Sequence, residues 1–296
     1  MRDALLNDEA KAAADAVGKL LEADVVLFNG RVGRTNQERL LKTLLARTRR
    51  RPNVFCVLFS EGGDPDAAYK ISRSLQSMYQ KFVCALPGYS KSAATIVLIG
   101  AHELVIGDDG EMGPLDVQLS KKDTLQDYES GLTVLNALTA LHEKAYLAWE
   151  YFFFQIEDSS KGSITVKTAS HAASELTTGL FAPVYGQIDP LQIGEATRAM
   201  AIGNEYGQRL NKNSQNLKGS ALEKLVSGYP DHGFVIDRTE AKSLFNRVRQ
   251  PTPEEVSLFS EIDAICDVEM GRKLGIVGFL NDEAPAAGPP IPEGGN

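Results

Sequence analysis

The chain has 296 residues, of which 43% are hydrophobic and 24% are charged. That is enough apolar material for one large domain, or for one domain with an appendage, and it excludes intrinsic disorder over most of the length. The net charge of −8 argues against nucleic-acid binding, because phosphate contacts need clustered Lys and Arg. The one basic run, residues 47–51, is predicted to be the solvated C-terminal turn of a helix.

Membrane and secretion signals are not visible in the sequence. The N-terminus has no apolar signal core, and no window reaches the roughly 18 apolar residues of a membrane span. The three cysteines, Cys56, Cys84 and Cys266, lack the spacing of metal ligands and are predicted to be buried thiols in a reducing compartment. We therefore expect a cytoplasmic protein with no membrane partner, no metal and no cofactor.

The N-terminal part of the chain alternates between two patterns. Short apolar runs typical of strands are followed by longer segments in which apolar residues recur at helical intervals. Strands are expected at 24–30, 54–59, 82–86 and 103–107, and helices at 5–22, 36–49, 65–79 and 92–101. This alternation with short connections predicts an α/β fold, with βα units around a mostly parallel sheet.

Beyond residue 116 the sequence favours helices. A loop and then a long helix are expected within 121–156, and the aromatic cluster at 149–154 is interpreted as core or subunit interface. A flexible connection is expected at 157–163. Further helices are expected at 168–180, 190–211, 219–227 and 239–245, and a disordered tail at 282–296.

These patterns suggest a domain organisation in four parts. Residues 1–22 are expected to form an N-terminal helix, and residues 23–156 the α/β core of the fold. Residues 157–281 form a mostly helical part that completes the fold or provides an interface, and residues 282–296 are the tail.

The stretch around Ser92 has the features of a nucleophile site. A strand-like run ends at Pro87, and an apolar helix begins near Ser92. The first N–H groups of a helix lack partners inside the helix, so the amide of Ala93 is placed to stabilise an oxyanion. Gly62 and Gly63, which follow the strand at 54–59, are candidates for the second donor. The alternative is that Ser92 only caps the helix and the glycines only form a turn.

Three motifs in this order resemble a known family. They are Glu61-Gly-Gly-Asp64, Ser92-Ala-Ala-Thr95 and Gly113-Pro-Leu-Asp-Val-Gln118. Together they resemble the Clp-fold serine peptidases of the SppA group, most of all the serine dehydrogenase proteinase family, over about residues 20 to 250. The resemblance implies a Clp/crotonase-like ββα superhelix with an extended helical C-terminal part. It also implies a ring-type homo-oligomer that acts on peptides or unfolded proteins.

A serine nucleophile needs a base. A Ser-Lys dyad requires a lysine whose pKa is lowered by burial, and the resemblance points to Lys144, although an ordinary helix-surface lysine is the alternative. Lys91 adjoins Ser92 and is expected to point away from its hydroxyl, and Lys121 and Lys122 are weaker candidates.

A ClpP-like triad would place a histidine about 25 residues after the serine, where this chain has Val117, so that arrangement is disfavoured. The resemblance suggests a supporting role for His232 in the active site, and stabilisation of its turn is the alternative. Asp116 is expected to accept hydrogen bonds from nearby backbone, and orientation of the base is the alternative. Thr95, one turn beyond Ser92, is expected to hydrogen-bond either the base or the local backbone.

The sequence therefore favours an ATP-independent serine endopeptidase with Ser-Lys chemistry. Two other functions stay open. A crotonase-type acyl-CoA enzyme would also use paired amides for an oxyanion, without needing Ser92. A catalytically inactive peptidase-fold scaffold would bind peptides without acylation.

Overall fold

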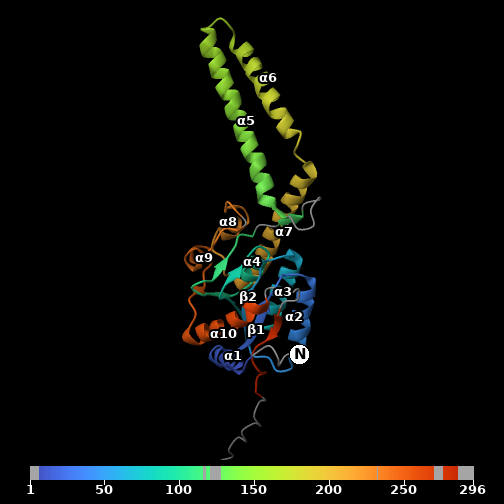
Figure 1. The fold of residues 1–296 in the computed structure, drawn as a ribbon, viewed down its shortest axis with the longest axis vertical. Coiled ribbons are helices and arrows are strands. Elements are labelled where there is room, and N and C mark those ends of the chain that lie inside the picture. Colours follow the sequence, from blue (N-terminus) through green and yellow to red (C-terminus); the bar gives the residue numbers. More distant parts are fainter. Residues whose placement is uncertain (1–6, 116–117, 121–127, 232, 270–275, 286–296) are drawn as a thin grey trace, which may run out of the picture. The chain divides into compact units, whose positions relative to one another are not determined.

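The computed structural model describes residues 7–115, 118–120, 128–231, 233–269 and 276–285. The chain divides into two compact units (Figure 1). The first unit comprises Met1–Asp116 and Ile202–Asn296, and the second comprises Val117–Ala201. Residues 156 and 157, between which a boundary was predicted, both lie in the helix Gly131–Ser160.

A six-stranded sheet forms the centre of the first unit, in the order β10-β1-β2-β3-β5-β9. All neighbouring pairs are parallel except β1 with β10. The inner strands are almost entirely apolar, as expected for strands buried on both faces. The predicted parallel α/β fold is confirmed. The strands are β1 (Ala23–Asn29), β2 (Asn53–Phe59), β3 (Lys81–Leu86), β5 (Glu103–Ile106), β9 (Val248–Arg249) and β10 (Ile276–Phe279).

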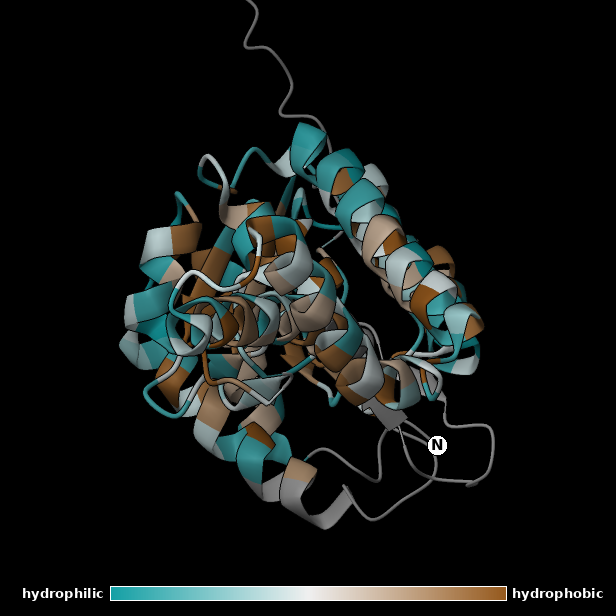
Figure 2. Ribbon diagram, turned by 90° about the horizontal axis from the view of Figure 1, so that it is seen from above, coloured by the Kyte–Doolittle hydropathy of each residue, from teal (hydrophilic) through white to brown (hydrophobic). Residues whose placement is uncertain are grey.

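Helices of the first unit alternate with these strands, and in Figure 2 hydrophilic and hydrophobic residues alternate along them, as expected for helices that bury one face. Asp64 caps α3 by accepting a hydrogen bond from the amide of Asp66. The helices are α1 (Asp8–Leu20), α2 (Arg34–Ala46), α3 (Pro65–Met78), α4 (Ala94–Ile99), α8 (Ala221–Ser227), α9 (Arg238–Leu244) and α10 (Pro253–Glu269). The C-terminal elements α10 and β10 were not predicted from the sequence.

A second, smaller ladder lies beyond the carboxyl ends of the central strands. Its strands β4 (Tyr89–Ser90) and β6 (Glu111–Met112) pair in parallel. Isolated parallel bridges join Val32 to Gly63 and Ser60 to Ser90. After each of β1, β2 and β3, the chain thus forms a short β-bridge or a two-residue strand before the next helix begins. This repeat of strand, short strand and helix confirms the ββα superhelix, and it brings the 60–63 segment beside the 89–93 segment.

The second unit contains a helical hairpin. Its helices α5 (Gly131–Ser160) and α6 (Val166–Tyr185) lie side by side (Figure 1) and contact each other extensively. Trp149 donates a hydrogen bond from Nε1 to Ser174 Oγ at 3.1 Å, and His142 stacks on Tyr185. Helix α5 continues through residue 160, so the predicted connection at 157–163 is shorter than expected. The remaining elements are β7 (Gln118–Ser120), β8 (Tyr128–Ser130) and α7 (Pro190–Ser214), which continues into the first unit.

The basic run at 47–51 differs from its prediction. Arg47 is buried, and its Nη2 donates to Asp24 Oδ1 at 2.8 Å. Tyr79 donates its hydroxyl to the other oxygen of Asp24, and burial together with this carboxylate raises the pKa of Tyr79 well above its usual range. The prediction that Arg47 is a solvated helix end was therefore wrong, because a buried carboxylate on β1 needs a cation beside it.

The cysteine prediction is confirmed in its structural part. Cys56, Cys84 and Cys266 are buried, and none of the three forms a disulfide. Cys56 and Cys84 are register partners on β2 and β3. None of the described helices is both long enough and apolar enough to span a membrane.

Candidate active site

Ser92 lies in a tight turn between β4 and α4. Its φ angle is +56°, a left-handed conformation that non-glycine residues rarely adopt, and its side chain is only 5% exposed. Helix α4 begins two residues later, at Ala94, so Ser92 precedes the helix instead of starting it. A serine held in this conformation costs of the order of 1–2 kcal/mol, and such strain collects at functional sites.

Gly62 packs directly against this turn. A Cβ atom at position 62 would lie 2.6 Å from Ser92 Cβ, 2.7 Å from Lys91 O and 3.0 Å from the amide nitrogen of Ala93. Gly62 also has a positive φ of +95°. Only glycine lets the two loops approach this closely. The structure therefore brings together the Gly-Gly turn and Ser92–Ala93, as the motifs suggested.

Two backbone amides of the site are available to a ligand. Gly63 pairs with Val32 in a parallel bridge whose hydrogen bonds run through the neighbouring residues, from Val32 N to Gly62 O and from Asp64 N to Val32 O. In this geometry the N–H of Gly63 itself points to the opposite side. Within the described part of the chain, neither Gly63 N–H nor Ala93 N–H donates a hydrogen bond. Both amides are therefore available as hydrogen-bond donors.

The amide of Gly62 has a different partner. It donates to Ser60 Oγ at 3.0 Å. Ser60 is joined to the next segment as well, because its carbonyl accepts from the amide of Lys91 at 2.9 Å. The sequence analysis did not single out Ser60, whose only signal is its place directly after β2. Ser60 thus holds the glycine turn against the serine turn, and Gly62 contributes its small size instead of its N–H.

Thr95 supports the local backbone. Its Oγ1 donates to the carbonyl of Gly113 at 2.8 Å, and the amide of Gly113 donates to the carbonyl of Ser90 at 3.1 Å. Thr95 was expected to hydrogen-bond either the base or the local backbone, and the observed bond is to the backbone. It connects α4 to the start of the Gly113-Pro114 segment, and so fixes the third motif beside the serine turn.

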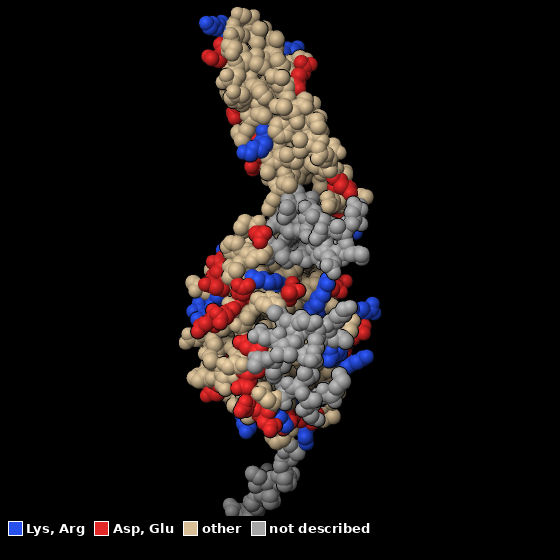
Figure 3. All heavy atoms as spheres, in the orientation of Figure 1, with Lys and Arg blue, Asp and Glu red and all other residues tan. Residues whose placement is uncertain are grey.

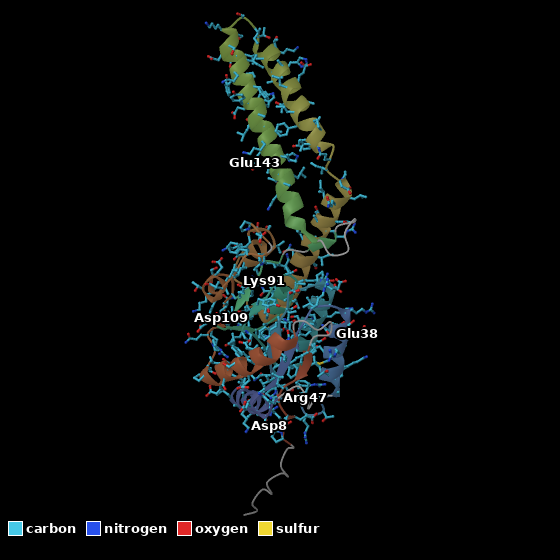
Figure 4. All side chains as sticks on the ribbon, in the orientation of Figure 1. Asp8, Glu38, Arg47, Lys91, Asp109 and Glu143 are labelled. Atoms are coloured by element: carbon cyan, nitrogen blue, oxygen red, sulfur yellow. The ribbon has the colours of Figure 1, made fainter. Side chains whose placement is uncertain are left out.

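Lys91 forms an ion pair next to Ser92. Its Nζ lies 2.7 Å from Glu111 Oε1 and 3.5 Å from the carbonyl of Phe234, and its side chain is only 16% exposed (Figure 4). The ammonium group of Lys91 thus contacts Glu111 on β6. The Lys91–Glu111 pair was not foreseen, because Glu111 lies 20 residues away in sequence.

The remaining candidates lie in other parts of the chain. Lys144 is on α5 in the second unit, with an exposed side chain. Asp116 and His232 fall outside the described residues. The segment that contains His232 is nevertheless joined to the site, because Ile236 forms an antiparallel bridge with Met112 on β6.

Comparisons with known proteins give weak matches. No family model matches the chain, and no curated protein matches it. Among solved structures, a mutant of the 1510-N membrane-bound stomatin-specific protease aligns with 14% identity and a TM-score of 0.33, over 49% of this chain and 66% of that one. Another mutant of that protease, in complex with a substrate peptide, aligns with 13% identity and a TM-score of 0.33, over 82% and 96%.

A mutant of ClpP1 from Listeria monocytogenes aligns with 19% identity and a TM-score of 0.26, over 33% of this chain and 58% of that one. The matched part of this chain thus spans less than two thirds of the length of two of these three structures.

Proposed function

We propose that this protein is a serine endopeptidase in which Ser92 is the nucleophile. The observation that carries the proposal is the buried, left-handed turn at Ser92, against which Gly62 packs. Among the described residues, the amides of Gly63 and Ala93 have no hydrogen-bond acceptor. A strained serine beside two free amides matches what acyl transfer requires, a positioned hydroxyl and an oxyanion hole.

The proposed reaction proceeds through an acyl-enzyme. Ser92 Oγ attacks the peptide carbonyl carbon while the base, Lys144 in its neutral form, takes the hydroxyl proton. The carbonyl oxygen becomes an oxyanion that accepts hydrogen bonds from Gly63 N–H and Ala93 N–H. The C–N bond then breaks as the lysine returns the proton to the leaving amine. Water, activated by the same lysine, attacks the ester carbonyl and releases Ser92.

The role of Lys144 rests on the family resemblance and makes a demand on the assembled enzyme. A lysine is neutral near pH 7 only when it is removed from water, and Lys144 is exposed in the single chain. The proposal therefore requires that substrate or assembly covers Lys144 during catalysis. Asp116 and His232 are retained as supporting residues on the same resemblance.

The conformation of Ser92 favours the peptidase over the two alternative functions. An acyl-CoA enzyme of the crotonase type would use the two amides but would gain nothing from a serine at a positive φ angle. An inactive scaffold would tolerate glycine there, which removes the strain. Retaining a serine at this position favours covalent chemistry.

Labelling with a fluorophosphonate probe tests the proposal directly. Intact mass should show one adduct on the wild type, none on Ser92→Ala, and labelling slowed at least about 100-fold in Lys144→Met, as expected for loss of a general base. Lys161→Met, which changes another exposed lysine on the hairpin, is the matched control and should label normally. A well-folded wild type that never reacts would contradict the peptidase function and favour the scaffold or the acyl-CoA enzyme.

The proposal extends to the setting of the enzyme. The resemblance to serine dehydrogenase proteinases suggests an ATP-independent enzyme, a ring-type homo-oligomer, and peptides or unfolded proteins as substrates. The composition suggests a cytoplasmic location without nucleic-acid or membrane partners. No cofactor is needed for this chemistry.

A further inference from the structure

Helix α5 exposes a row of large apolar side chains. Leu147, Tyr151 and Phe154 are 51%, 61% and 55% exposed. At 3.6 residues per turn they fall within about 60° of one another on the helix. Trp149, which contacts Ser174 on α6, points to a different side. These three residues, here named the α5 stripe, therefore lie on a face that α6 does not cover.

Helix α6 exposes a second row. Leu176, Leu180 and Val184 are 49%, 58% and 39% exposed and follow each other at intervals of four residues. The residue that follows each of them in the sequence is partly buried. The last of these partly buried residues, Tyr185, stacks on His142 of α5. The row is thus turned by about 100° from the side that faces α5. These residues, here named the α6 stripe, lie on another face of the hairpin than the α5 stripe.

The hairpin carries few charges around these stripes. Residues 145–156 contain one charged residue, Glu150, and residues 176–188 contain none. Figure 3 shows uncharged residues over most of the visible surface of α5 and α6. A helix that binds an anionic membrane surface is normally rich in Lys and Arg on its polar face. The charge pattern therefore favours a protein partner over a lipid surface.

The exposed apolar area is close to what a specific interface needs. With the flanking residues Tyr146 and Val166, which are 62% and 65% exposed, the two stripes expose roughly 700 Å² of side-chain surface. The smallest specific protein interfaces bury about 1,200 Å² in total, of which somewhat more than half is apolar. Two stripes from two molecules are thus sufficient for a reversible contact.

We propose that the α5 stripe of one copy packs on the α6 stripe of a second copy. The two stripes occupy different faces of the hairpin, so a single two-fold contact between identical faces would leave one of them in water. A head-to-tail contact covers both with one kind of interface and leads to a closed ring or a filament. It also places the aromatic side chains of α5 against the aliphatic side chains of α6.

Two variants test this head-to-tail arrangement in the full chain. The α5 variant carries Leu147→Gln, Tyr151→Gln and Phe154→Gln, and the α6 variant carries Leu176→Gln, Leu180→Gln and Val184→Gln. Glutamine keeps the helix propensity and removes the apolar surface. The control variant, Glu157→Gln, Lys167→Gln and Thr178→Gln, changes exposed polar positions on the same hairpin. Circular dichroism checks that each variant keeps its helix content.

Sedimentation velocity over a range of concentrations gives the result. The wild type and the control should assemble, and each stripe variant alone should be monomeric, with an apparent Kd raised at least about 100-fold. An equimolar mixture of the two variants should form heterodimers and stop there, because each retains the one stripe that the other lacks.

Other results overturn the proposal. A monomeric wild type would do so, as would single variants that still assemble or a mixture that stays monomeric. Recruitment of a monomeric wild type to vesicles of phosphatidylcholine and phosphatidylglycerol would assign the stripes to a membrane instead. The assembly test does not depend on the labelling of Ser92, so a failure of either proposal is recognised separately.

Discussion

Gly62 leaves no room for a side chain beside Ser92, since a Cβ atom at position 62 would lie 2.6 Å from that of the serine. The contact joins two loops that are 30 residues apart in sequence and lie beside each other because β2 and β3 are parallel neighbours. The geometry of the candidate oxyanion hole depends on this contact, because the same atom would also approach the amide nitrogen of Ala93.

Replacing Gly62 by alanine should disturb the site and the fold together. The new Cβ meets backbone and side chain of the serine turn, and φ at this position is +95°. We expect Gly62→Ala to lower the free energy of unfolding by about 3 kcal/mol and to abolish probe labelling. Gly33→Ala is the control, since its Cβ would have nothing within 4 Å. Equal stability of the two variants in urea unfolding would contradict the close approach.

Ser92→Gly should be more stable than Ser92→Ala. Both lack the nucleophile, but only glycine adopts a φ of +56° without strain, and this relief exceeds the extra entropy that glycine loses on folding. We expect a difference of about 1 kcal/mol in the free energy of unfolding. If alanine proves as stable as glycine, the left-handed turn is not present in solution.

Asp24→Asn should be strongly destabilising. The substitution leaves Arg47, whose side chain is 4% exposed, without its buried counter-charge. The expected loss is about 3 kcal/mol, measured by chemical denaturation at pH 7. The control is Glu38→Gln, which breaks the exposed pair of Glu38 with Arg34 (Figure 4) and should cost less than about 0.5 kcal/mol. Similar losses in both variants would mean that Arg47 is solvated after all.

The ion pairs of Glu103 should make stability depend on pH. Burial raises the pKa of this carboxyl, but hydrogen bonds from Lys81 and Arg249 outweigh it and hold the pKa below the usual 4.5. A lowered pKa in the folded state contributes stability above pH 4.5, which is lost as the pH falls through the folded value.

Glu103→Gln should therefore cost about 1 kcal/mol at pH 7 and progressively less below pH 4.5. Urea unfolding of both proteins at several pH values between 3 and 7 measures the difference. A loss that stays constant over this range would show that the charge of Glu103 does not stabilise the fold.

Local patterns in the sequence determined the secondary structure of the first unit and pointed to the site. Apolar runs bounded by polar turns gave β1, β2, β3 and β5 to within about a residue, because buried parallel strands need continuous apolar sequence. The motifs pointed to Ser92 and the Gly-Gly turn, because a nucleophile needs a hydroxyl group and a close approach of two loops needs glycine. Helix α10 and strand β10, in contrast, were not predicted.

Only the tertiary structure decided how the candidate site is built. The positive φ of Ser92, the bond from Thr95 to Gly113 and the pairing of Lys91 with Glu111 all depend on segments far apart in the chain. The same holds for Arg47, whose burial follows from Asp24 on another element. Local periodicity records which face of a segment is apolar, but a contact between distant segments depends on sheet order and register, which no single segment encodes.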